Sequence, residues 1–340
     1  MILLSITIIF LLVQGVLLFI RNLRRMRHII VFLTFCFGLT FLFDLLVLYP
    51  QVELHGYGTT PLVTALVALT MFIPSLSVVL TRWVMREGFE DVWLRPNLKG
   101  NMRHYLLAWL LPPALVAVGA VVYFLCFPSQ YAPSAGGIDG VVKVAVLVGS
   151  VLLAPVLNCI ACLGEEWGWR GYLLPKTIEL LRFEERPSCI KLIGLLVGNG
   201  VIWGLWHAPL IAVGHNYGTL YPGAPWTGIA TMCLFTFSVG TLLAYLCWRT
   251  RSCWPGVIGH GAINGIASAA LLFSAGGANP HPLLGPSATG LIGGSGLLLG
   301  ALVVIVLWHR AMPKPLTPQP SLWQSLKQHL PFKHKKSNAL

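Results

Sequence analysis

The sequence predicts an all-α, polytopic integral membrane protein with about nine transmembrane helices and a cluster of polar residues inside the membrane. Two observations lead to this fold class. Only 10% of the 340 residues are charged and 56% are hydrophobic, whereas a soluble domain has roughly 25% charged residues. The apolar residues are also gathered into stretches of about 20 residues, which is the length that a helix needs to cross a bilayer.

Nine stretches of the chain are apolar and long enough to span a membrane. The first lacks a basic segment before it and a small-residue cleavage site, so we expect a retained helix rather than a removed signal peptide. The fifth is overlong, and Pro155 is expected to kink it. The predicted spans are 1–20, 29–49, 61–81, 105–127, 142–164, 191–213, 227–248, 254–274 and 289–308.

The connections between these spans alternate in charge. Of the 23 lysine and arginine residues, all but Lys143 lie around every second connection or in the C-terminal tail. The positive-inside rule then places the N-terminus outside and the C-terminus in the cytoplasm. Membrane orientation therefore accounts for the net charge of +12, and we do not expect a nucleic acid partner. We expect a multi-pass protein of a bacterial plasma membrane, with a site that faces the cytoplasm.

Two adjacent carboxylates, Glu165 and Glu166, follow the fifth apolar stretch. Charged side chains inside a span cost several kcal/mol unless they are paired or hydrated, which makes them candidates for a functional site. Glu166 and Arg170 are four residues apart and can pair on a helix. Glu165 is then left about 16 Å inside the membrane, measured from Lys176 along the helix. It could act as a general base, although an interfacial helix end would also explain these charges.

Two later spans carry imidazoles at comparable depth. His207 lies deep in the sixth span, one helical turn after Trp203, and on its own it would be read as a packing residue. His260 and Asn264 in the eighth span are four residues apart and share one helix face. On their own they could be a polar pair that joins two helices. Taken with Glu165, they predict one water-filled cavity.

Other polar residues carry weaker signals. Asp44 lies inside the second span and has no evident partner in the sequence. Cys159 and Cys162 have the spacing of half a metal site, but no second pair completes it. His215 follows the sixth span, and we expect it to be solvated in an outer loop.

The ordered set Glu-Glu-x-x-x-Arg, aromatic-x-x-x-His and His-x-x-x-Asn on three membrane helices resembles the CPBP family. Its members are CAAX prenyl endopeptidases and bacteriocin-processing or immunity proteins, also called Abi proteins. The resemblance covers about 145–270, and Trp203 stands where the family usually has Phe. The matching residues are Glu165, Glu166, Arg170, Trp203, His207, His260 and Asn264.

This resemblance implies an intramembrane endopeptidase that acts on a peptide or protein substrate at the membrane. In that mechanism Glu165 activates water, His207 orients it, and His260 and Asn264 stabilise the oxyanion. Glu166, Arg170 and Trp203 would support these groups. No cofactor is then expected. The alternative is a zinc ion held by Glu165, His207 and His260.

Two other functions remain open at this stage. The polar cluster could form the relay of a transporter, although Asn264 has little use in a proton relay. The chain could also be a non-catalytic membrane partner, such as an immunity protein. The sequence identifies neither the substrate nor the oligomeric state. The predicted regions are the N-terminal helices 1–140, a CPBP-like core 141–275, a last transmembrane helix 276–311 and a basic cytoplasmic tail 312–340.

Overall fold

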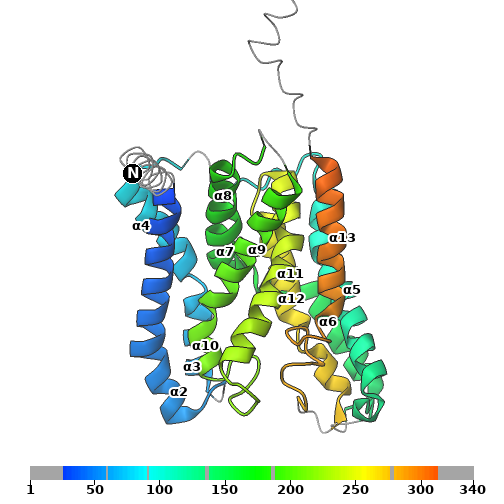
Figure 1. The fold of residues 1–340 in the computed structure, drawn as a ribbon. Coiled ribbons are helices and arrows are strands. Elements are labelled where there is room, and N and C mark those ends of the chain that lie inside the picture. Colours follow the sequence, from blue (N-terminus) through cyan, green and yellow to red (C-terminus); the bar gives the residue numbers. More distant parts are fainter. Residues whose placement is uncertain are drawn as a thin grey trace, which may run out of the picture.

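The chain folds into a bundle of helices that run between two ends of the molecule (Figure 1). The computed structural model describes residues 26–312, apart from 59, 90–91, 135–137, 185–187 and 276–278. The described helices are the segment from Met26 into η1 (Asp44–Leu48), α2 (Tyr49–His55), α3 (Pro61–Thr70), α4 (Ile73–Met85), α5 (Met102–Cys126), η2 (Pro128–Gln130), α6 (Gly140–Leu157), α7 (Cys159–Gly168), η4 (Trp169–Leu173), α8 (Leu174–Leu180), α9 (Cys189–Trp206), α10 (Ala208–Ala212), α11 (Trp226–Thr250), α12 (Trp254–Ile266), η5 (Ala269–Phe273) and α13 (Ser295–Ala311).

The all-α membrane architecture is confirmed, whereas the count of nine spans is not. Within the described residues, seven helical segments are long and apolar enough to cross a membrane, and Ser295–Ala311 is a shorter apolar helix. The predicted span 1–20 and the basic tail beyond Met312 lie outside the described residues. The seven segments are Met26–His55, Pro61–Met85, Met102–Cys126, Gly140–Leu157, Cys189–Trp206, Trp226–Thr250 and Trp254–Phe273.

Most of the lysines and arginines in the described connections lie at one end of the bundle, which we call the basic end. It is the end at which α8 and α13 finish, at the top of Figure 1. Lys143 is the one basic residue that departs from the charge pattern of the sequence, and it lies in the first turn of α6 at the opposite end. Its side chain is nevertheless only 1% exposed. Its Nζ donates to the carbonyl oxygen of Pro133 at 2.7 Å and lies 5.6 Å from the ring centre of Phe273. This lysine is therefore a buried structural group, so it does not weaken the charge asymmetry.

The predicted kink at Pro155 corresponds to a break in the helix. α6 ends at Leu157, and α7 begins at Cys159. Proline has no N–H, so the carbonyl of Val151, four residues earlier, loses its helical partner. The indole of Trp109 donates to this carbonyl at 2.8 Å instead. The break separates α6 from α7 and α8 in Figure 1 and directs α7, which carries Glu165, into the bundle.

Glycines allow the helices around Glu165 to approach one another closely. A Cβ on Gly164 of α7 would lie 2.6 Å from the carbonyl oxygen of Met71, in the break between α3 and α4. A Cβ on Gly200 of α9 would lie 2.6 Å from the Cα of Phe237 on α11. Small residues at such crossings let backbones meet and pack in a membrane, where apolar burial supplies little driving force.

Replacing Gly200 with alanine is expected to destabilise the fold, whereas Gly198→Ala in the same helix should be neutral or slightly stabilising. A Cβ on Gly198 meets nothing within 4 Å, and overpacking costs about 1–3 kcal/mol. The measurement is the thermal unfolding midpoint of the detergent-purified protein. Equal midpoints for the two variants would contradict the close α9–α11 contact.

Candidate active site

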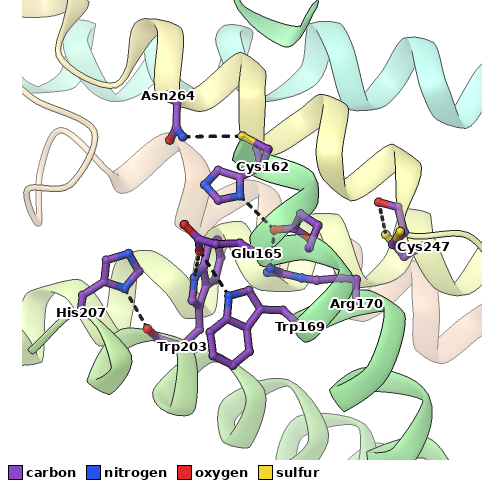
Figure 2. Close-up of polar contacts among 11 residues, drawn as sticks. Cys162, Glu165, Trp169, Arg170, Trp203, His207, Cys247 and Asn264 are labelled. Atoms are coloured by element: carbon purple, nitrogen blue, oxygen red, sulfur yellow. Dashed lines mark hydrogen bonds and ion pairs between the residues drawn. The ribbon is translucent and has the colours of Figure 1, made fainter. Parts of the chain in front are cut away.

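Three helices bring the predicted residues to one cavity of about 260 Å³. Glu165 comes from α7, His207 from the end of α9, and His260 and Asn264 from α12. Trp203 of α9 also lines this cavity. Residues nearly 100 positions apart thus share one space, as the sequence predicts. Figure 2 shows their polar contacts.

The carboxylate of Glu165 is held by two indoles (Figure 2). Its Oε2 accepts from Trp203 Nε1 at 2.8 Å and from Trp169 Nε1 at 3.2 Å. The side chain is 3% exposed, and a buried carboxylate is costly unless donors satisfy it. Trp203 therefore does more than conserve an aromatic ring, because the phenylalanine usual in the family could not donate this bond. Trp169 was not predicted, although its spacing of four residues from Glu165 on a helix could have suggested it.

The neighbouring carboxylate, Glu166, makes separate contacts through its Oε1, whereas its Oε2 is buried without a hydrogen-bond partner among the described residues. Its Oε1 accepts from Arg170 Nη1 at 2.7 Å and from His260 Nδ1 at 3.0 Å, and the residue is 0% exposed. The guanidinium of Arg170 lies 4.2 Å from the ring centre of Trp203. The predicted pair of Glu166 and Arg170 is thus formed, and it joins α7 to α12 through His260. Buried charges are tolerated only with such partners.

The two histidines each use one ring nitrogen in a structural bond. His207 Nδ1 donates to the backbone carbonyl of Trp203 at 2.8 Å. His260 Nδ1 donates to Glu166. In each ring this leaves Nε2, and both rings line the cavity. A bond at one nitrogen fixes which tautomer the other nitrogen presents.

Asn264 lies on the exposed side of the site, where its Nδ2 donates to the thiol of Cys162 at 3.7 Å (Figure 2). A thiol is a weak acceptor. The amide can therefore exchange this bond for one to a stronger acceptor, such as an oxygen that gains negative charge. Cys162 belongs to the Cys-x-x-Cys pair, and both of its cysteines are free thiols.

The zinc alternative requires Glu165, His207 and His260 to converge on one point. Across the described ranges, no three His, Cys, Asp or Glu side chains lie close enough to form a metal-binding group. Each of the three residues uses one side-chain atom for a protein contact, Glu165 with Trp203, His207 with the Trp203 carbonyl and His260 with Glu166. Among the described residues these three side chains are not gathered closely enough to hold a zinc ion as they stand, and we derive no step through one.

The cavity lies toward the end of the molecule opposite the basic end. Its wall includes His215 and Asn216 from the connection between α10 and α11, Ser268 after α12, and Thr289 before α13. These connections lack lysine and arginine. None of the lining residues comes from the basic-end connections. The expected cytoplasmic-facing site combined the positive-inside rule, whose orientation stays a prediction, with a cavity near the basic end, and the cavity lies toward the other end. The sequence shows charge but not the direction in which a cavity extends.

The structure adds to what the sequence indicates for two polar residues outside the motifs, His215 and Asp44. His215 lies in the loop after α10, as the sequence predicts, but it is partly buried and lines the cavity, with its ring parallel to that of His207. The loop folds back through a bond from the His215 amide to the Leu210 carbonyl at 2.9 Å. Asp44 is only 4% exposed, and neither of its carboxylate oxygens has a hydrogen-bond partner among the described residues.

Comparison with known proteins supports the resemblance seen in the sequence. Residues 144–266 match the family described as type II CAAX prenyl endopeptidase, Rce1-like. The chain is also similar to CAAX prenyl protease 2 of Methanococcus maripaludis, with 26% identity over 168 residues. That alignment covers 48% of this chain and 55% of the relative, so the chain spans about half the length of the curated protein it matches. The predicted resemblance to the CPBP family is confirmed, and the matched segment contains all seven motif residues.

Glu166→Gln is expected to destabilise the protein strongly. The change leaves Arg170 and His260 without their buried counter-charge, and breaking a buried ion pair on one side costs about 3–5 kcal/mol. Glu179→Gln on α8, where the side chain is 77% exposed, is the matched control. Thermal unfolding in detergent measures both. An unfolding midpoint for Glu166→Gln equal to that of the control would contradict the structural role of Glu166.

Proposed function

We propose that this chain is an intramembrane endopeptidase that hydrolyses peptide bonds of membrane-associated substrates with a water activated by Glu165. The observation that carries this proposal is the different treatment of two adjacent carboxylates. Glu166 is neutralised by Arg170 and His260. Within the described part of the chain, the hydrogen-bond donors to Glu165 are two indoles, and the residue lines the cavity. The match to the CAAX prenyl endopeptidase family supports the same reaction class.

In the first chemical step, a water molecule held between Glu165 and His207 attacks the carbonyl carbon of the peptide. Glu165 takes one proton from this water as the new C–O bond forms. The other O–H group of this water donates a hydrogen bond to His207 Nε2. This nitrogen is an acceptor because the Nδ1–H of the same ring donates to the Trp203 carbonyl. Two hydrogen bonds therefore fix the water in the orientation for attack, which lowers the entropic part of the barrier.

The carbonyl electrons move onto the peptide oxygen, which becomes an oxyanion. Asn264 Nδ2 donates to it in place of its weak bond to Cys162. His260 donates through Nε2 when its ring is protonated, and the adjacent Glu166 carboxylate stabilises that cation. Preorganised donors of this kind are worth about 10²–10³ in kcat each. In the second step, the C–N bond breaks, and Glu165 returns its proton to the leaving amine.

The substrate class follows from the place of the site. A cavity formed between membrane-spanning helices takes peptides that reach it from the lipid or from the non-basic end, so a transmembrane segment or a lipid anchor would deliver them. The name of the Methanococcus maripaludis relative indicates a prenylated C-terminal peptide for that protein. We include prenylated peptides and leader peptides among the substrates to be tested. The bilayer is the expected partner.

The direct test is cleavage of a library of peptides and membrane proteins by the detergent-purified wild type and by Glu165→Gln. The amide keeps an oxygen that can accept from Trp203 and Trp169, so the variant should fold but release no products. Products from the wild type alone would establish the reaction and identify a substrate. Equal cleavage by both proteins would contradict the role of Glu165. No cleavage by either would favour a non-catalytic membrane partner.

Chelators are expected to leave the activity unchanged, because the proposed mechanism uses only protein groups and water. The measurement is the cleavage rate after incubation with EDTA or phenanthroline, together with the zinc content per chain. Inactivation that is reversed by added zinc would contradict the metal-free mechanism.

By the positive-inside rule we propose that the basic end faces the cytoplasm and that the cavity lies toward the opposite side of the membrane, which we expect to be a bacterial plasma membrane. Two exposed native cysteines report on this orientation: Cys189 begins α9 at the basic end, and Cys126 ends α5 at the other. In variants that retain one cysteine, an impermeant maleimide should label Cys126 on intact cells and Cys189 only after permeabilisation. The reverse pattern would contradict the proposed orientation.

A further inference from the structure

A third imidazole, that of His215, stands beside His207 in the cavity. The two ring centres are 6.3 Å apart, and their planes differ by only 10°. His215 is not part of the three motifs and comes from the connection that follows α10. Its position is fixed by the bond from its amide to the Leu210 carbonyl and by a left-handed backbone at Asn216, with φ +64°. The ring is therefore a built part of the cavity wall.

A second residue from the N-terminal helices holds His215 in place. The hydroxyl of Tyr57 is hydrogen-bonded to His215 Nδ1, and the two rings meet edge to face with centres 5.7 Å apart. Tyr57 follows α2, far from the catalytic motifs in sequence. This contact connects the Met26–His55 helical segment to the cavity that holds Glu165.

The direction of this hydrogen bond follows from the surroundings of the two residues. Burial lowers the pKa of His215 to about 3, so the ring is neutral at neutral pH. Burial and the nearby charge of Asp44 raise the pKa of Tyr57, which keeps its hydroxyl protonated. Tyr57 therefore donates, His215 Nδ1 accepts, and the proton of His215 is carried on Nε2.

We propose that Tyr57 and His215 are positioning residues for His207. The hydrogen bond from Tyr57 holds the His215 ring parallel to the His207 ring. The fixed His215 ring limits rotation of the His207 imidazole, so that the Nε2 of His207 continues to face the water site. The inference rests on the proposed function for its kinetic consequence, but the ring contact can be tested without it.

The matched variants are Tyr57→Phe and Tyr123→Phe. Both remove a hydroxyl that is bonded to a histidine Nδ1, because Tyr123 bonds to His281 at 2.8 Å, and neither Tyr123 nor His281 lines the catalytic cavity. Tyr57→Phe and His215→Phe are expected to lower kcat by about 10-fold with KM within about 2-fold of wild type, which is the loss of roughly one hydrogen bond. Tyr123→Phe should produce no such loss.

Nitrogen NMR of labelled histidines in the full-length, inactive Glu165→Gln protein tests the positioning itself. The His207 ring signals, assigned with His207→Gln, should change when Tyr57→Phe is added and stay constant with Tyr123→Phe. A wild-type kcat and unchanged His207 signals in Tyr57→Phe would overturn the proposal. So would an equal loss in Tyr123→Phe. If the wild type cleaves nothing but the NMR change is seen, the proposed function fails and the positioning contact stands.

Discussion

The arrangement of the site depends on the buried contact among Glu166, Arg170 and His260. None of these residues is more than 6% exposed, so their charges must satisfy one another in a medium where an unpaired ion is very costly. The contact joins α7 to α12, and the stacking of Arg170 on Trp203 adds α9. Three helices that are distant in sequence are thus held in one register by electrostatics, with glycines permitting their close approach.

This contact gives two adjacent carboxylates different roles. Glu166 satisfies a cation and an imidazole, whereas the indoles of Trp169 and Trp203 orient Glu165 toward the cavity without neutralising it. In enzymes with two neighbouring carboxylates, a difference between their surroundings often indicates which one acts as the base. The indole N–H of Trp203 donates to Glu165, and phenylalanine has no such donor. Tryptophan at position 203 is therefore compatible with the site.

The sequence predicted those features that depend on local spacing. The pairing of Glu166 with Arg170 follows from helical periodicity, and the break near Pro155 follows from the missing N–H. The meeting of Glu165, His207, His260 and Asn264 followed from their similar depth. The place of His215 could not be predicted, because the loop returns to the cavity through backbone bonds that have no sequence signature. The direction of the cavity likewise depends on tertiary packing.

The central claim is that Glu165 and His207 act on the same water molecule. The most direct measurement is a double-mutant cycle in kcat/KM with Glu165→Asp, His207→Ala and the double variant on one cleaved peptide. Groups that work as a unit show strongly non-additive losses. The account predicts that the double variant is no slower than the slower single variant, within about 3-fold. A double variant slowed by the product of the two single losses would contradict a shared water.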